Sequence, residues 1–201
     1  LLKLLAGLVD GHEGAVLYDG LSVRDLERTD LRARLGLVLE YNELFEGTVE
    51  ENVSLGRPDV GTADVLRALD VIGIREQVML LPQGLQTRII DGGLLLPQTV
   101  QRKLVIARAI AGRPRLLVID DVLQHFDTAS KRQIIQALTT GTDRWTVVAA
   151  SHDPLFLASA DQVVVLDAGR LRMAGTFAAM LEDPYAAAII STGGTASASE
   201  A

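Results

Sequence analysis

The sequence predicts an α/β fold in which helices flank a largely parallel β-sheet, with an antiparallel β portion near the N-terminus and a helical insertion. Residues 116–119 are four consecutive aliphatics followed by Asp120 and Asp121, and such a run is typical of a central strand covered on both faces. A second apolar run, residues 145–150, comes after a stretch with helical spacing. Residues 48–111 show helical periodicity interrupted by Pro and Gly, which favours helices and loops there.

The N-terminal part is expected to contain one helix end and two strands. Leucines at helical spacing predict that residues 1–8 are the end of a helix that begins upstream, so we expect the chain, which lacks an initial Met, to be a fragment. Residues 14–20 predict a short strand that enters an Asp-Gly turn, which is a strong hairpin signal. Residues 25–34 predict a turn or a short helix, and residues 35–39 predict a second strand.

The middle of the chain, residues 48–111, is expected to form a helical subdomain inserted in the α/β core. Thr48 followed by Glu51 matches a capping box, which predicts the start of a helix. Further helices are predicted at residues 63–71, capped by Thr62, and at residues 100–111. Residues 89–97 are expected to be irregular because their pattern fits neither a helix nor a strand.

After the central strand, the alternation of helix and strand continues. Asp127 or Thr128 can cap a helix that ends near residue 138. The remaining predicted elements are a buried strand at 145–150, a strand pair at 163–166 and 171–173, and a last helix that Thr176 caps and that ends near Glu182. Residues 1–190 are therefore assigned to one domain, and residues 191–201 to a disordered tail with too little apolar content to pack.

The composition excludes several classes of function. The chain carries 19 Lys and Arg against 26 Asp and Glu, a net charge of -7, which argues against nucleic acid as a partner because phosphate binding needs clustered cations. It has no Cys, which excludes a disulfide framework and a thiolate metal site. No apolar run approaches the about 18 to 20 residues of a membrane-spanning helix, so this piece is expected to be soluble.

The two acids that follow the central strand are the first candidate site. Ligands of open α/β sheets bind at the carboxyl ends of the strands, and paired acids there can hold Mg²⁺ and orient a water for phosphoryl transfer. The alternative is a strand that simply enters a polar turn. His152 also follows a strand, 32 residues after Asp120, and a histidine in that position can equally be a polar turn residue.

From residue 1 to about residue 183, the order and spacing of these segments resemble the ATP-binding cassette of an ABC transporter, in particular the exporter type. The matching segments are 35–53 (the Q-loop and the segment after it), 101–110 (the helix after the signature motif), 116–121 (Walker B), Asp127 (D-loop), His152 (switch histidine) and 160–176. The resemblance implies a P-loop NTPase-like sheet core, ATP as the nucleotide and Mg²⁺ as the metal.

The resemblance also implies a role for each matching residue. Asp120 would hold Mg²⁺, Asp121 would orient the attacking water, and His152 would contact the γ-phosphate. Glu40, at the Q-loop position, would be both a metal ligand and a catalytic residue. Asp127 would communicate across a dimer of two cassettes.

The implied partners are a second cassette and the transmembrane domain of the same transporter. Residues 40–46, with Tyr41 and Phe45, and residues 86–93 would contact the transmembrane domain, although the two aromatic residues could equally fill a local cluster. The implied location is the cytoplasmic face of a bacterial-type plasma membrane, and the implied activity is export driven by ATP hydrolysis.

Three departures from the family pattern predict weak catalysis. The phosphate-cradling Walker A loop should lie immediately before Leu1 and is not in the sequence, so this chain alone is expected to bind ATP weakly and to be inactive. Glu40 replaces the usual Gln, and its carboxylate would repel the γ-phosphate. Asp121 replaces the usual Glu, which withdraws the carboxylate by about 1 Å, a displacement that can cost on the order of a hundredfold in rate.

The signature motif departs furthest. Where the family has Leu-Ser-Gly-Gly-Gln, this chain has Leu96, Pro97, Gln98, Thr99 and Val100. The usual motif presents a hydroxyl and Gly amides at a helix N-terminus to the γ-phosphate on the facing subunit, so these five residues are predicted nucleotide contacts. Pro97 lacks the hydroxyl and a backbone donor, and Gln98 and Thr99 hinder close backbone approach. Each lost charged hydrogen bond would weaken dimer closure by about 1.5 to 3 kcal/mol.

Three other functions remain as alternatives. The chain could be a catalytically silent cassette that serves as a structural or regulatory partner in a dimer, or a soluble ABC ATPase without a transport role. A phospho-acceptor receiver domain would also place acids at strand ends, but it needs a Lys on a later strand, and no Lys follows Lys131. Outside the matching motifs, we interpret His12 and His125 as exposed turn residues, and Arg88, Arg102 and Lys103 as solvated charges.

Overall fold

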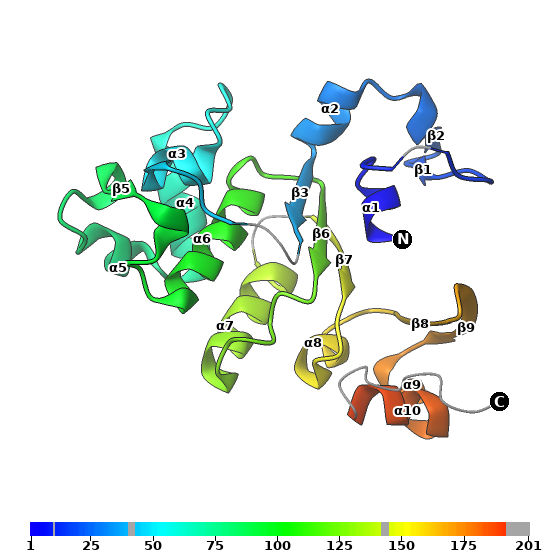
Figure 1. The fold of residues 1–201 in the computed structure, drawn as a ribbon. Helices are drawn as coiled ribbons and strands as arrows, with labels where there is room; N and C mark the ends of the chain where they lie inside the picture. The colour runs from blue at the N-terminus through cyan, green and yellow to red at the C-terminus, as the bar shows by residue number, and fades with distance from the viewer. Residues whose placement is uncertain (10, 40–42, 142–144, 192–201) are drawn as a thin grey trace.

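The computed structural model describes residues 1–9, 11–39, 43–141 and 145–191 of the chain. Its centre is a three-stranded parallel sheet with the strand order β3-β6-β7 (Figure 1). These strands are β3 (Leu35–Val38), β6 (Leu116–Asp120) and β7 (Thr146–Ala150). The predicted mixed α/β fold with a parallel core is therefore confirmed.

The sheet is covered unevenly. Leu117, Val118 and Ile119 in the central strand are at most 1% exposed, as expected for a strand with a neighbour on each side and helices over its faces. The short helix α1 (Leu2–Leu5) contacts β6 and β7, while α6 contacts β3. The prediction that β7 is a buried strand was wrong, because in the described part of the chain it pairs only with β6 and three of its five residues are exposed.

The N-terminal segment forms the predicted hairpin. β1 (Leu17–Tyr18) pairs with β2 (Leu21–Ser22) in antiparallel fashion. The two turn residues have positive φ angles of 51° at Asp19 and 82° at Gly20, which is the backbone conformation that a tight two-residue hairpin requires. A 3-10 turn (Val23–Asp25) and α2 (Arg28–Ala33) then lead to β3, so the expected short helix is present.

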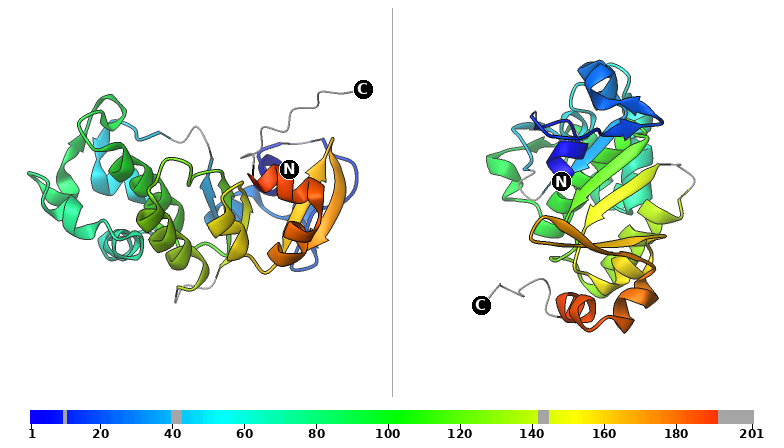
Figure 2. Two further views of the ribbon diagram at one scale, coloured as in Figure 1. Left: turned by 90° about the horizontal axis from the view of Figure 1, so that it is seen from below. Right: turned by 90° about the vertical axis from the view of Figure 1, so that its right-hand side faces the viewer.

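A helical lobe follows β3 and lies on one side of the sheet (Figures 1 and 2). Its elements are β4 (Gly47–Thr48), α3 (Val49–Ser54), α4 (Thr62–Ile72), α5 (Arg75–Met79), a 3-10 turn (Gly84–Gln86), β5 (Arg88–Ile89), a second 3-10 turn (Asp91–Gly93) and α6 (Gln98–Ala111). β4 and β5 form a two-stranded antiparallel pair that the sequence did not predict.

The N-termini of α3 and α4 in this lobe are capped by residues that lie within three positions of each other in the sequence. The predicted capping box is present, with the N–H of Glu51 donating to Thr48 Oγ1 at 3.0 Å and the N–H of Thr48 donating to Glu51 Oε2 at 2.7 Å. Thr62 is not a cap, because α4 already starts at that residue. Gly61 occupies the N-cap instead, and its N–H donates to the Asp64 carboxylate at 3.3 Å.

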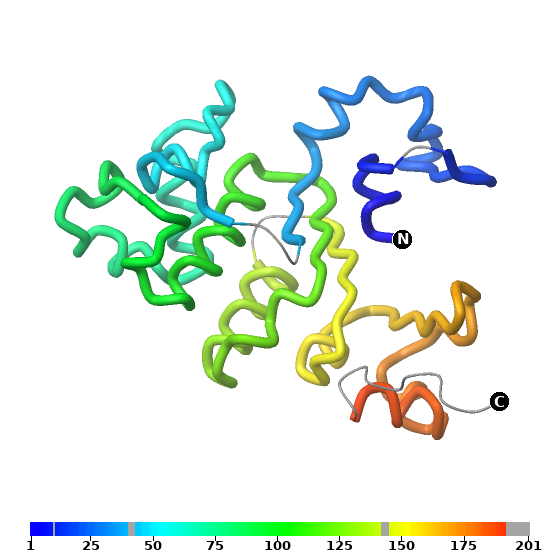
Figure 3. The backbone as a smooth tube through the Cα atoms, viewed as in Figure 1, coloured from blue at the N-terminus to red at the C-terminus, as the bar shows by residue number. Residues whose placement is uncertain are grey.

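The C-terminal part of the chain alternates between helices and strands. Its elements are α7 (Thr128–Thr139), α8 (Pro154–Ala158), β8 (Val163–Asp167), β9 (Arg170–Gly175), α9 (Phe177–Glu182) and α10 (Pro184–Ser191). Thr176 caps α9 as predicted, accepting the N–H of Ala179. β8, β9, α9 and α10 share a small apolar cluster of their own, and the chain trace shows them on the side of the sheet away from the helical lobe (Figure 3).

α6 is buried on almost every side and links the helical lobe to the sheet. Leu104, Ile106 and Ile110 are fully buried within it. Its last turn leaves carbonyl groups without a helical partner, and arginines of the lobe donate to them: Arg57 to Arg108 O at 3.0 Å, and Arg67 to Ile110 O at 2.8 Å. These cations also complement the negative end of the helix dipole.

None of the helices in the described ranges combines the length and the apolar character needed to cross a bilayer. The main apolar core instead joins the helical lobe, α7 and the central sheet in one contiguous cluster. This cluster holds the strand ends in a fixed relation to α6.

Replacing Gly36 with Ala should destabilise the protein by about 1 to 3 kcal/mol, the usual cost of overpacking. A Cβ at this position of β3 would lie 2.4 Å from the carbonyl oxygen of Ala109 and 2.8 Å from Leu117 Cδ1. Thermal or urea denaturation measures the effect. Gly175→Ala is the matched control, because a Cβ there meets only ordinary contacts at 3.5 Å or more, and equal stability of the two variants would contradict the prediction.

Candidate functional site

The register of the parallel sheet brings the predicted site residues to one edge. Asp120 pairs with Ala150 across β6 and β7, and the N–H of Asp121 donates to Ala150 O at 3.0 Å. The chain leaves β7 at that point, so His152 emerges beside the acids. β3 ends at Val38, which pairs with Ile119, and its continuation therefore runs to the same edge.

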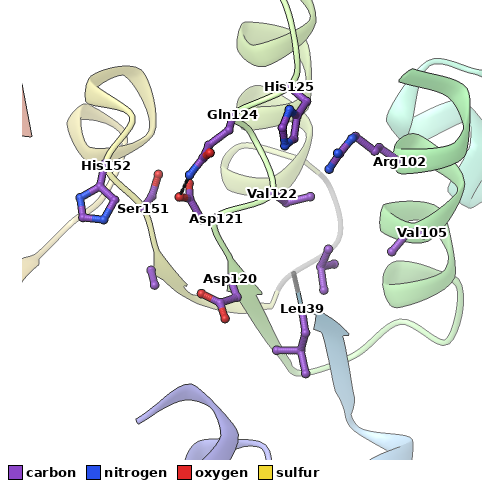
Figure 4. A pocket seen from close by; sticks show the side chains of 12 residues that line it. Leu39, Arg102, Val105, Asp120, Asp121, Val122, Gln124, His125, Ser151 and His152 are labelled. Carbon is purple, nitrogen blue, oxygen red and sulfur yellow. Dashed lines mark hydrogen bonds between the residues drawn. The ribbon is translucent and has the colours of Figure 1, made fainter. Parts of the chain in front are cut away.

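These strand ends form one side of a cleft of about 430 Å³. Asp120 and Asp121 lie in its middle, between His152 near the end of β7 and Arg102, which extends from α6 on the other side (Figure 4). Three of the predicted site residues thus share one cleft although they come from two strands. Glu40, like Tyr41, lies outside the described residues, although its neighbour Leu39 lines the cleft.

Asp121 is held in an unusual conformation. Its φ angle is 43°, in the left-handed region that non-glycine residues rarely occupy. Such outliers gather at functional sites, where the surrounding structure maintains them. The side-chain amide of Gln124 donates to the Asp121 carboxylate (Figure 4), so the orientation of this carboxylate is fixed by the loop after β6.

The turn that carries His152 is also fixed, by the residue after it. Asp153 caps α8 by accepting the N–H of Leu155 at 2.9 Å, and its other carboxylate oxygen accepts Lys131 Nζ at 2.5 Å. Its own N–H donates to Ser151 Oγ at 3.1 Å. The Lys131–Asp153 pair is largely shielded from solvent and ties the histidine turn to α7.

The acid pair fits a magnesium ion that shares its coordination with a substrate. Mg²⁺ usually binds through one or two carboxylates and completes its octahedron with water and phosphate oxygens. Asp120 supplies one carboxylate at the cleft, and Asp121, the next residue in the chain, also lines it. In the described part of the chain, no cluster of three or more His, Asp and Glu side chains could form an all-protein metal cage.

Asp127 does not line the cleft and instead caps α7. Its Oδ1 accepts the N–H groups of Ala129 at 2.9 Å and Ser130 at 3.0 Å, and its Oδ2 accepts the Ser130 hydroxyl at 2.7 Å. The backbone and hydroxyl donors of Ser130 lower the pKa of Asp127.

Lys103 was predicted to be a solvated charge, which is wrong, since it is only 7% exposed. Burial lowers its pKa, against the opposing charge of Asp127.

The segment at the signature position lies at the N-terminus of α6, outside the cleft. Pro97 occupies the N-cap without a side-chain hydrogen bond, and its carbonyl accepts the N–H of Val100 at 2.8 Å. Pro97, Gln98 and Thr99 are exposed, whereas Leu96 is half-buried and Val100 is buried. Gln101 fixes the approach to this segment by donating to Gly93 O at 2.9 Å and Leu96 O at 2.8 Å.

The segment around Phe45 is attached to α6 by a buried polar network. Asn52, fully buried, accepts the N–H of Phe45 at 3.0 Å and donates to Phe45 O at 2.9 Å. Arg108 donates to Asn52 O at 2.7 Å and to Glu43 O at 3.0 Å, and its guanidinium lies 5.6 Å from the centre of the Phe45 ring. α6 therefore connects this surface segment with the cleft.

Sequence reasoning missed two features of the site and one feature outside it. Arg102 was predicted to be solvated, but it is half-buried and lines the cleft. His125 is exposed as predicted, yet it also lines the cleft. His12 was predicted to be exposed, but both of its ring nitrogens are buried without a hydrogen-bond partner among the described residues. For Arg102, the helical spacing of α6 could have shown that it is one turn from the buried Val105.

The sequence is similar to those of known transport proteins. The family model described as ABC transporter matches residues 1–124. The chain is 30% identical over 181 residues to the fatty acid ABC transporter ATP-binding/permease protein of Mycobacterium bovis, which covers 90% of this chain and 29% of that protein. It is 31% identical over 192 residues to heavy metal tolerance factor 1 of Caenorhabditis elegans, with 90% and 24% covered.

The structure is similar as well. A solved structure of a bacterial Atm1-family ABC exporter with ATP bound matches with a TM-score of 0.84 and 30% identity, over 94% of this chain and 34% of that chain. The match includes the central sheet and the helical lobe, because it covers nearly all residues. The chain spans about a third or less of the length of these proteins.

Replacing Asp127 with Ala should lower the melting temperature most strongly near neutral pH. The folded-state pKa of Asp127 is below its ordinary value of 3.8, so its stabilising contribution is present above that value and is lost as the pH falls through the folded pKa. Thermal denaturation near neutral pH and below about pH 3 tests this. Asp161→Ala, which removes an exposed carboxylate, is the control, and a pH-independent effect of Asp127→Ala would contradict the prediction.

Proposed function

This chain belongs to the ABC transporter family, and we propose that it is the domain that binds and hydrolyses ATP in an exporter and couples hydrolysis to transport. The observation that carries the proposal is the shared cleft of Asp120, Asp121 and His152 at the carboxyl edge of the parallel sheet. Nucleotides and other ligands of open α/β sheets bind at this edge.

Each residue of the cleft would have a separate role in phosphoryl transfer. Asp120 and, from the Q-loop position, Glu40 would hold Mg²⁺, which neutralises phosphate charge as the terminal phosphate is transferred. Asp121 would hold the attacking water in line, and the His152 imidazole would donate a hydrogen bond to the terminal phosphate. The fixed Asp153 turn and the Gln124 hydrogen bond support these positions.

The same residues give reason to expect slow turnover. Asp121 is one methylene shorter than the usual Glu, and Gln124 holds its carboxylate in place, so the carboxylate cannot simply extend toward the water. A misplacement of about 1 Å can cost on the order of a hundredfold in rate. The wild-type domain would therefore be a weak ATPase.

The partners of the proposed domain are a second cassette and a transmembrane domain at the cytoplasmic face of the membrane. Residues 96–100 would face the nucleotide of the second cassette, and the exposure of Pro97, Gln98 and Thr99 at the start of α6 leaves them accessible for that contact. Asp127 would communicate across the same dimer. The segment around Phe45, which is 42% exposed, and residues 86–93 would meet the transmembrane domain.

A second candidate function is a catalytically silent cassette in an asymmetric dimer. Pro97 at the N-cap favours it, because a proline provides neither the hydroxyl nor the backbone donor that the family uses at this position. In this case the domain would hold the dimer together while the other cassette hydrolyses ATP.

Changes at Asp121 separate the two candidates in the complete natural polypeptide that carries this chain. If the domain is a weak ATPase, Asp121→Asn should abolish ATP turnover, and Asp121→Glu should raise it by up to about a hundredfold, since it restores the reach of the carboxylate. Phosphate release measured with MgATP tests both. A silent cassette would show the same turnover in the wild type and in both variants, which would exclude the weak ATPase.

Restoring the family's Ser-Gly-Gly sequence by the combined changes Pro97→Ser, Gln98→Gly and Thr99→Gly should raise the ATPase rate about tenfold or more. The new hydroxyl and the free amides would return hydrogen bonds to a charged phosphate, each contributing about 1.5 to 3 kcal/mol. The measurement is steady-state ATP turnover of the complete polypeptide. Thr139→Gly, at the last residue of α7, serves as a control for added glycine, and an unchanged rate in the triple variant would count against a contact at this position.

A further inference from the structure

Arg102 occupies a position in the cleft that the family resemblance leaves without a role. It lies in α6, one turn before Val105, and both residues line the cleft that contains Asp120 and Asp121. Figure 4 shows its side chain extending from α6 toward the loop of Gln124 and His125. The guanidinium therefore lies on the α6 side of the cleft, and the acids lie between it and His152.

Arg102 has a buried donor without an acceptor in the part of the chain that the structure describes. Its Nε makes no hydrogen bond there, and the described residues provide no ion pair for the side chain. Arg57 and Arg108 in the same region instead donate to backbone carbonyls at 2.7 to 3.0 Å. Arginine stays charged at any physiological pH, and a shielded donor without an acceptor costs free energy. A ligand acceptor would recover this cost.

The charges in the cleft define the kind of ligand. Asp120 and Asp121 supply negative charge to the cleft. Arg102 is the only Lys or Arg among the described residues that line the cleft. A ligand that satisfies both sides carries a cation against the acids and an anion against Arg102. A metal-bound phosphate has this arrangement, and guanidinium groups bind phosphate oxygens through paired hydrogen bonds.

We propose that Arg102 donates hydrogen bonds to the terminal phosphate of a nucleoside triphosphate bound in the cleft. This inference rests on the proposed function, since it assumes that the cleft holds a nucleotide. It identifies a specificity-determining contact: a ligand that lacks the terminal phosphate leaves Arg102 without a partner. The domain therefore distinguishes ATP from ADP partly through a residue on α6.

The test measures nucleotide binding to the complete natural polypeptide by calorimetry, with MgATP and MgADP as probes. Arg102→Gln should weaken MgATP binding about tenfold, because a hydrogen bond to a charged group contributes about that factor. MgADP binding should change by less than about twofold. Arg102→Lys, which retains the charge, should recover part of the loss. Arg132→Gln, which changes an arginine on α7 outside the cleft, is the matched control.

The outcomes separate the inference from the proposed function. If the wild type binds MgATP and Arg102→Gln binds it equally well, the inference is overturned and the proposed function stands. Equal losses for MgATP and MgADP would also overturn it, because they indicate a structural role. If the wild type binds neither nucleotide, the proposed function fails and the inference fails with it.

A second measurement uses the unmodified protein and does not depend on the folding of a variant. Phenylglyoxal modifies accessible guanidinium groups, and mass spectrometry of the peptide that contains Arg102 reports the extent. MgATP should protect Arg102 at least about threefold more than MgADP does, as expected for a contact made only by the terminal phosphate, while Arg132 should react equally in both. Equal protection by the two nucleotides would overturn the inference.

Discussion

The parallel pairing of β6 with β3 and β7 is the constraint on which the candidate site depends. The register places Asp120 opposite Ala150 and Val38 opposite Ile119, so three chain segments leave the sheet at one edge. A shift of one residue would turn every side chain of β6 to the other face. The buried aliphatic side chains of β6 oppose that shift, because each is packed in a position that a shift would change.

α6 packs against both the sheet and the helical lobe and so links the two parts of the molecule. Gly36 allows β3 to approach the backbone of α6 at Ala109, and Arg108 connects the same helix to the buried Asn52 and to the segment around Phe45. Arg102 extends from this helix into the cleft. Any displacement of α6 would therefore reach the cleft and the segment around Phe45 together.

Local signals accounted for much of the fold. The hairpin follows from its Asp-Gly turn, α3 from its capping box, and β6 from four aliphatics in sequence, since these features act between near neighbours in the chain. The short helix α5 and the β4–β5 pair have no comparable local signal. Short elements of this kind are stabilised by packing against distant segments, which one-dimensional periodicity does not report.

For the site, the sequence by itself determined the candidate residues: an acid pair after a buried strand, and a histidine after the next strand of the sheet. Only the tertiary structure decided which of them meet, because strand register and helix packing join residues that are far apart in the chain. It placed Asp121 at a positive φ beside Gln124 and turned Arg102 into the cleft. The physical reason is that burial and charge pairing depend on neighbours in space, whereas the sequence specifies only neighbours along the chain.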